Sequence, residues 1–242
     1  MTGSAMDLPA VEAAAPALVS LYKSAGVSLR AHGLDGGRAA VYLVLDYSGS
    51  MRPYYADGTV QALADRVLGL SAHLDADGRI PVVFFSTEVH AVEEVRLGGH
   101  EGRVTAIASG LGHMGKTSYD AAMDAVIDHY LDSGTREPAL VVFQTDGGPL
   151  SKPAAERYLC KAARLPLFWQ FVGFGNTRSS QFDFLRRLDE LPVPAARAVD
   201  NAGYFHAGPD PRTVPDAVLY DRLLGEFPAW LRAARAAGIV RA

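Results

Sequence analysis

Short apolar runs alternate along the chain with longer segments that carry apolar residues at helical spacing. The strand-sized runs are Val41–Leu45, Ile80–Phe85, Val89–Val92, Ala139–Thr145, Leu167–Val172 and a weaker one near Tyr204–His206. Runs of this length that alternate with helical segments are typical of α/β domains with a mainly parallel sheet. Only a few polar residues separate the second run from the third, so these two are predicted to form a hairpin with one antiparallel strand at a sheet edge.

The segments between these runs are predicted to be amphipathic helices, because apolar residues recur there at i, i+3 and i+4. The predicted helices cover Val60–Leu74, Tyr119–Leu131, about Pro153–Ala163, a C-terminal segment from Leu219 to Ala234, and about 8–30 before the first strand. Pro228 lies inside the C-terminal segment, so the helix there should bend or restart. No Gly/Ser linker, repeat or low-complexity block interrupts the chain, and we therefore expect one domain over residues 1–242.

Length, charge and cysteine content narrow the class of protein. With 242 residues, of which 49% are hydrophobic, the chain can bury a full core without disulfides or a structural metal. A formal net charge of -4 argues against a protein that binds nucleic acid through a strongly basic surface. Cys160 is alone, which excludes an intramolecular disulfide, and it is most simply a small buried hydrophobe. No apolar run spans a membrane and no signal peptide is evident, so we expect neither a membrane-spanning nor a secreted protein.

Hard oxygen ligands gather where predicted strands end. The first strand ends in Asp46, followed closely by Ser48 and Ser50, and the fourth strand is followed by Asp146. Thr117 ends a Gly-rich loop directly before the clearest helix. Because open α/β sheets bind ligands at the carboxyl ends of their strands, these side chains should converge at one edge. Two carboxylates and three hydroxyls form an oxygen-only set that suits a magnesium-like cation, which keeps waters and leaves a position open.

This set resembles the metal-ion-dependent adhesion site of the von Willebrand factor A (vWA) domains. That site is written Asp-x-Ser-x-Ser, then a Thr in a later loop, then an Asp. The matching metal-ligating residues in this chain are Asp46, Ser48, Ser50, Thr117 and Asp146. The resemblance covers roughly residues 8–236. It implies the vWA fold, which is Rossmann-like and doubly wound, with a mainly parallel six-stranded sheet, one antiparallel edge strand and helices on both faces.

Within the vWA family, the chain looks most like bacterial proteins associated with tellurium resistance and general stress clusters. The residues that carry this likeness are the segments Ser48–Tyr55, Val82–Ser86 and Phe168–Gly173 and the helix before the first strand. The resemblance implies an adaptor or scaffold rather than an enzyme, in a cytoplasmic complex. The five ligating residues would hold Mg²⁺, with Mn²⁺ or Ca²⁺ as alternatives. An acidic side chain of a protein partner would complete the coordination shell.

A nucleotide-binding protein is the main alternative, because Gly110–Thr117 satisfies the phosphate-binding loop pattern G-x-x-x-x-G-K-[ST]. Taken alone, this pattern indicates an ATPase or GTPase. Such a loop requires a buried strand immediately before it, so that backbone N–H groups can wrap a phosphate at a helix N-terminus. The preceding Arg103–Ser109 is polar and has the spacing of a helix. We therefore expect no nucleotide, and Lys116 becomes a solvated loop cation.

Two enzymatic interpretations of the first strand end are also weak. A phosphotransferase of the haloacid dehalogenase type would use Asp46 as nucleophile, but its acid and base is normally a second Asp two residues on, where Ser48 stands. A serine hydrolase would need Gly-x-Ser-x-Gly around its nucleophile, and the flanking glycines are absent. We therefore expect no catalytic residues.

Overall fold

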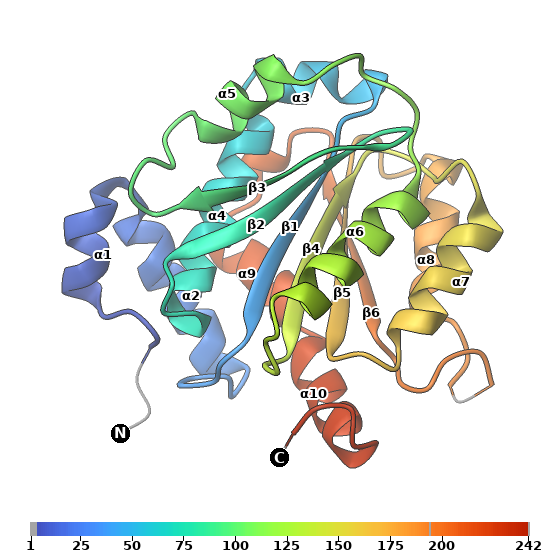
Figure 1. The fold of residues 1–242 in the computed structure, drawn as a ribbon. Coiled ribbons are helices and arrows are strands. Elements are labelled where there is room, and N and C mark those ends of the chain that lie inside the picture. Colours follow the sequence, from blue (N-terminus) through green and yellow to red (C-terminus); the bar gives the residue numbers. More distant parts are fainter. Residues whose placement is uncertain (1–3, 194, 242) are drawn as a thin grey trace.

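The computed structural model describes residues 4–193 and 195–241; residues 1–3, 194 and 242 of the predicted domain lie outside the described part. Six strands form one sheet, in the order β3-β2-β1-β4-β5-β6 (Figure 1). The strands are β1 (Ala40–Asp46), β2 (Arg79–Phe85), β3 (Val89–Arg96), β4 (Ala139–Thr145), β5 (Leu167–Phe174) and β6 (Ala202–Gly208). Only the β2–β3 pair is antiparallel in this sheet. The predicted mainly parallel sheet with one antiparallel edge strand is confirmed.

Helices cover both faces of the sheet (Figure 1). One face carries α2 (Val19–Ala31), α4 (Thr59–Leu74), α9 (Asp216–Leu224) and α10 (Phe227–Ala236), and the other carries α6 (Tyr119–Asp132), α7 (Lys152–Ala162) and α8 (Asp183–Asp189). Successive side chains of the central strand β1 point alternately into the two cores. Leu43 and Leu45 pack on the α4 side, whereas Tyr42 and Val44 pack on the α6 side. Because both faces are covered, β1 reads as a continuous apolar run.

The helix predicted over about 8–30 is divided in the structure. Helix α1 (Leu8–Ala14) ends before Pro16, a short 3-10 turn covers Pro16–Leu18, and α2 then begins at Val19. Ala15 has φ -152° and ψ 71°, outside the helical region. The ring of Pro16 disfavours helical geometry in Ala15, and this breaks the helix. The apolar periodicity continues across the break, which is why one helix was predicted.

The other boundaries follow the sequence closely. The C-terminal segment restarts as predicted, since α9 ends at Leu224 and α10 places Pro228 in its first turn, where a missing N–H costs nothing. The less secure final strand is present as β6. Two short helices lie near the carboxyl edge of the sheet, α3 (Arg52–Ala56) and α5 (Arg103–Gly110). Within the described residues, no helix is long and apolar enough to cross a membrane.

Candidate metal centre

Strand pairing brings the two candidate carboxylates to the same edge of the sheet. Strands β1 and β4 are adjacent and parallel, with Leu45 opposite Gln144, so Asp46 ends β1 beside the end of β4 and Asp146 follows. The Asp46 side chain is 0% exposed. Its two carboxylate oxygens accept hydrogen bonds from the Ser48 backbone N–H, at 2.8 Å, and from the Thr145 hydroxyl, at 2.7 Å. The bond to the N–H two residues on is the local turn that Asp favours after a strand.

The two serines of the motif connect Asp46's loop to Asp146. A 3-10 turn over Gly49–Met51 follows Ser48 and brings the two hydroxyls together, with 3.2 Å between the Ser48 and Ser50 oxygens. The Ser50 hydroxyl donates to Asp146 Oδ1 at 2.9 Å. Ser48 is buried and Ser50 is exposed, so the row of oxygens runs from the interior to the surface.

Thr117 lies on a third loop that meets the first. Gly115 pairs with Ser48 in an isolated parallel bridge, and its carbonyl accepts the Gly49 N–H at 3.0 Å. Thr117, together with Ser48 and Ser50, lines a cavity of about 380 Å³. In the described part of the chain, the Thr117 hydroxyl makes no hydrogen bond to the other four predicted ligands. The structure thus brings all five residues to one edge and links four of them by hydrogen bonds.

The two carboxyl groups ionise with difficulty. Burial, and then the negative charge of Asp146, raise the pKa of Asp46 to about 6, although hydrogen bonds from Ser48 and Thr145 oppose the shift. Burial also raises the pKa of Asp146, against the hydrogen bond from Ser50. A like-charge pair in a partly buried site is a cost that a divalent cation would offset.

The donor set fits a hard cation that uses few carboxylates. Across residues 4–193 and 195–241, no three His, Cys, Asp or Glu side chains gather into a metal-binding group. A cation at this edge would therefore rely on Asp46, Asp146, the neighbouring hydroxyls and water. Magnesium binds in this manner, through one or two carboxylates with several waters retained.

Comparisons with known proteins assign the family. Residues 38–240 match the family model described as vWA-TerF-like, the vWA domain found in the TerF C terminus. The chain belongs to this vWA family. A protein of Bacillus subtilis (strain 168), called uncharacterized protein YcbR, is 36% identical over 223 residues, which cover 90% of this chain and 88% of that protein.

Two solved structures resemble this chain at low sequence identity. The pilus adhesin SpaC from Lactobacillus rhamnosus GG has a TM-score of 0.51 and 10% identity, over 81% of this chain and 30% of that one. The manganese-loaded TRAP protein of Plasmodium vivax has a TM-score of 0.48 and 20% identity, over 76% of this chain and 72% of that one. The SpaC match supports the fold of this vWA domain.

The structure does not support the nucleotide-binding alternative for this vWA domain. The segment before the glycine-rich loop is helix α5 (Arg103–Gly110), as its spacing predicted, and not a buried strand. The Lys116 side chain is exposed, and the Lys116 backbone N–H donates to Thr87 Oγ1 at 2.9 Å. One of the N–H groups that a phosphate loop would aim at its ligand is thus already bonded within the chain.

Two residues around Asp46 were not anticipated from the sequence. Thr145 donates to the Asp46 carboxylate, and the Tyr55 hydroxyl donates to the Asp46 backbone carbonyl at 3.1 Å. Thr145 directly precedes Asp146, so a hydroxyl next to a candidate ligand was an available signal. Its contact depends on the register between β1 and β4, which a single sequence does not reveal.

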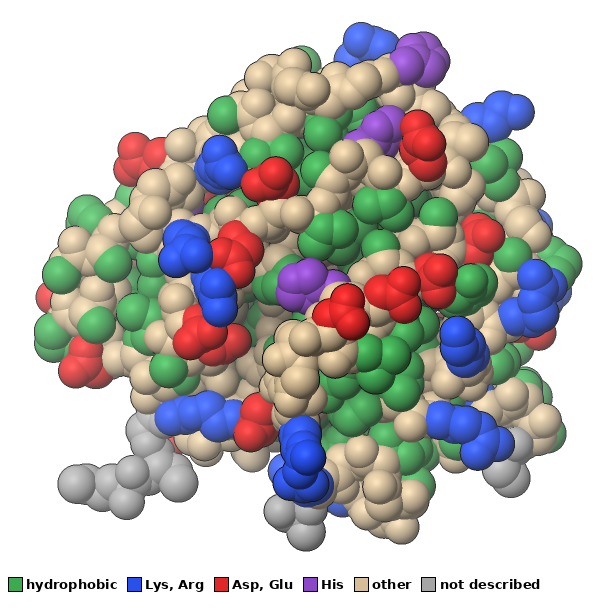
Figure 2. Space-filling model, viewed as in Figure 1, with side chains coloured by type: hydrophobic (Ala, Val, Ile, Leu, Met, Phe, Trp, Pro, Cys, Tyr) green, Lys and Arg blue, Asp and Glu red, His purple; other side chains and the backbone are tan. Residues whose placement is uncertain are grey.

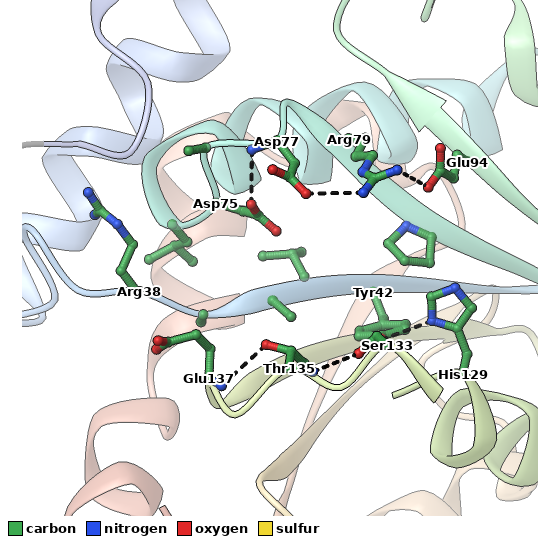
Figure 3. Close-up of a pocket in the computed structure, with 16 residues that line it drawn as sticks. Arg38, Tyr42, Asp75, Asp77, Arg79, Glu94, His129, Ser133, Thr135 and Glu137 are labelled. Carbon is green, nitrogen blue, oxygen red and sulfur yellow. Dashed lines mark hydrogen bonds and ion pairs between the residues drawn. The ribbon is translucent and has the colours of Figure 1, made fainter. Parts of the chain in front are cut away.

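Another cavity, of about 400 Å³, lies at the opposite edge of the sheet, where β1 and β2 begin (Figure 3). Three of its charged groups are paired with one another, since Arg79 bonds to both Asp77 and Glu94. The Tyr42 hydroxyl lies 3.1 Å from His129 Nδ1. Acidic and basic side chains are also interspersed over the face seen in Figure 2. Side chains of both charges thus line this cavity.

Proposed function

We propose that this vWA domain binds a protein partner through a divalent metal ion, preferably Mg²⁺. The observation that carries the proposal is the row of oxygens from buried Asp46 through Ser48 and Ser50 to Asp146, beside the cavity that Thr117 also lines. Three separate loops supply these groups. A purely structural turn would not need two carboxylates with raised pKa values at one strand edge.

The residues divide the work of holding a cation. Asp46 and Asp146 supply the negative charge, while Ser48, Ser50 and Thr117 supply neutral oxygens that replace water without adding repulsion. Thr145 and the Ser48 N–H fix the Asp46 carboxylate, in the way that outer hydrogen bonds orient metal ligands. Mg²⁺ bound there would supply a coordination position for a carboxylate of the partner.

The proposal is a binding role and not a catalytic one. Ser48 stands where a phosphotransferase would carry its second Asp, so the carboxyl that acts as acid and base in that chemistry is replaced by a hydroxyl. On the sequence likeness to bacterial tellurium-resistance and stress proteins, we propose that this adaptor acts in a cytoplasmic stress-response complex. The partner in that complex is a protein that offers an Asp or Glu carboxylate to the metal.

The test combines metal binding with partner capture. Calorimetry with Mg²⁺, Mn²⁺ and Ca²⁺ should show binding to the wild-type chain, and Ser50→Ala should weaken it by about tenfold or more, because the hydroxyl donates to Asp146 and borders the cavity. Ser20→Ala, an exposed serine of α2, is the matched control and should bind like wild type.

Affinity capture from a bacterial lysate, with and without chelator, then tests the partner. Asp46→Asn removes the buried charge but keeps the shape, and it should lose capture that depends on Mg²⁺. Metal affinity that is unchanged in both Ser50→Ala and Asp46→Asn would contradict the proposal. Micromolar ATP or GTP binding that Lys116→Ala abolishes would instead restore the nucleotide-binding alternative.

A further inference from the structure

A second, apolar cavity lies directly beside the candidate metal centre. It has a volume of about 240 Å³ and opens between α3, α5 and the loop before Gly115. The walls that matter here are Tyr47, Tyr55, Ala56, Ala108 and Met114. Tyr47 and Ala108 are buried, whereas Ala56 is exposed at the mouth.

Residues that line the cavity are direct chain neighbours of residues in the metal centre. Tyr47 stands between Asp46 and Ser48 in the chain, and Tyr55 donates its hydroxyl to the Asp46 carbonyl at 3.1 Å. Met114 directly precedes Gly115, which pairs with Ser48. Any segment that places a carboxylate on the metal therefore has this cavity within reach of its neighbouring side chains.

The aromatic walls are held in place before any partner arrives. The Tyr47 hydroxyl donates to the Ala108 carbonyl at 3.0 Å, so the polar ends of Tyr47 and Tyr55 are both bonded to backbone. The two rings meet edge to face, with 5.2 Å between centroids and 88° between planes. Rings fixed in this way present apolar surface at little entropic cost to binding.

The volume matches one apolar side chain. It exceeds the roughly 150 Å³ of a dry cavity that accepts benzene, and it is smaller than the roughly 300–1,000 Å³ of pockets for drug-sized molecules. A cavity between these two sizes has room for one leucine, isoleucine, methionine or phenylalanine side chain.

Charge at the mouth favours an acidic segment as the occupant. Arg52 lines the same cavity, is exposed, and has no hydrogen bond or ion pair within the described residues. A guanidinium in this position attracts negative charge. The metal centre requires a carboxylate from the partner as well, so both features select the same kind of peptide.

We propose that this cavity is a specificity pocket, which receives one large apolar side chain from an acidic partner segment while a nearby carboxylate of that segment binds the metal. The inference rests on the proposed metal-dependent function. It adds the sequence that the partner must present: an Asp or Glu and an apolar residue at a fixed spacing.

Selection from a library of short random peptides displayed on phage tests the pocket. The immobilised full chain is panned in Mg²⁺ and eluted with EDTA. The eluted peptides should share an Asp or Glu with Leu, Ile, Met or Phe at one spacing. A synthetic peptide of this kind should bind the Ala56→Trp variant about tenfold or more weakly, because the indole fills the mouth of the pocket. Mg²⁺ affinity of that variant should be unchanged.

The matched control is Ala106→Trp, an exposed alanine of α5 that does not line the cavity, and it should bind the peptide like wild type. Replacing the peptide's apolar residue by Ala should weaken binding to wild type but not further weaken binding to Ala56→Trp, as coupled sites require. Peptides that share an acid without an apolar residue would overturn the pocket and leave the metal function standing. No EDTA-eluted peptide at all would overturn both.

Discussion

The carboxyl group of Asp46 is the most constrained side chain of the site. It is buried, faces a second carboxylate and receives two hydrogen bonds, and its pKa rises to about 6 because burial and Asp146 outweigh those bonds. In the metal-free protein, protonated Asp46 therefore contributes to the free energy of unfolding. This contribution is fully present below the ordinary pKa of 3.8 and is lost as the pH rises through about 6. A bound cation reverses that preference.

Magnesium affinity should therefore depend on pH. The cation must displace the proton on Asp46, so affinity should be constant above about pH 7 and should fall by up to about tenfold per pH unit below about pH 6. Calorimetric titration across this range measures the effect. Affinity that does not change between pH 5 and pH 7 would show that Asp46 is not a ligand.

A second carboxyl group, far from the metal centre, also lowers stability at neutral pH. Burial, and then the charges of Glu226 and Asp200, raise the pKa of Asp189 to about 7, with Arg197 acting in the opposite direction. Its contribution to stability is present below pH 3.8 and is lost as the pH rises through about 7. Asp189→Asn should melt higher than wild type above pH 7 and at about the same temperature near pH 4.

Thermal unfolding at several pH values checks this difference. Asp35→Asn, an exposed carboxylate in a turn, removes the same charge and should leave the pH dependence of the melting temperature unchanged. A melting temperature of Asp189→Asn that stays below that of wild type at every pH would show that the Asp189 carboxylate stabilises the fold when ionised.

At single positions, the sequence predicts a functional residue where residue types recur at the spacing of a known motif. It does not predict the burial of a side chain that depends on tertiary packing. The five oxygen ligands could be proposed because their types and order match a motif. Cys160 was predicted to be a small buried hydrophobe, but in the structure it is only partly buried on α7. The helical periodicity near Cys160 predicts a helix, but it does not define the rotation of α7 about its own axis, which sets how exposed Cys160 is.

At the scale of elements, the loop over Leu111–Ser118 determines whether Thr117 reaches the metal centre. Gly115 is packed so closely that a Cβ there would lie 2.5 Å from Thr87 Oγ1 and 2.8 Å from Ser86 Oγ. Gly115→Ala should push the loop away from Ser48 and carry Thr117 with it. Mg²⁺ affinity should then fall by about tenfold or more, as measured by calorimetry.

Gly112→Ala is the control within the same loop, because a Cβ at Gly112 meets nothing within 4 Å. It should keep wild-type metal affinity. Equal losses in the two variants would mean that loop flexibility, and not the Gly115 contact, positions Thr117.

The boundaries of helices could be predicted where a residue such as proline marks them. They could not be predicted where apolar residues keep helical spacing on both sides of a break. The restart at Pro228 and the helical character of Arg103–Ser109 were both evident from local sequence. The break at Pro16 was not, because the apolar spacing on either side suits one continuous helix. Its cause is the conformation of Ala15, a local effect of the following proline.

For the whole molecule, the helices before β1 belong to the core although the family match begins at residue 38. Tyr22 of α2 stacks on His73 of α4, and the His73 ring bonds to the Tyr22 carbonyl at 2.7 Å. Leu29, on the same helix, is 2% exposed within the core that α4 and β1 share. The sequence pattern predicted a helix here, but not that α2 would pack against both α4 and α9.

Leu29→Ala should therefore destabilise the entire domain. Removing this buried side chain should cost about 2–5 kcal/mol of unfolding free energy, with one cooperative transition retained. Val27→Ala, on the same helix but 60% exposed, should change stability by no more than about 0.5 kcal/mol. Urea denaturation compares the two, and similar small effects would mean that α2 unfolds independently of the sheet.

The distance in sequence between the two halves of the metal centre sets an order of events during folding. Ser50 and Asp146 are 96 residues apart, and they meet only when β1 has paired with β4. Contacts of such long range form slowly, since a large loop must close before any interaction rewards it. Helices, the β2–β3 hairpin and the β1–β2 pair can all form earlier without creating the site. On refolding, the capacity to bind Mg²⁺ should therefore appear together with the slowest structural phase, which makes the cation a reporter of the completed central sheet.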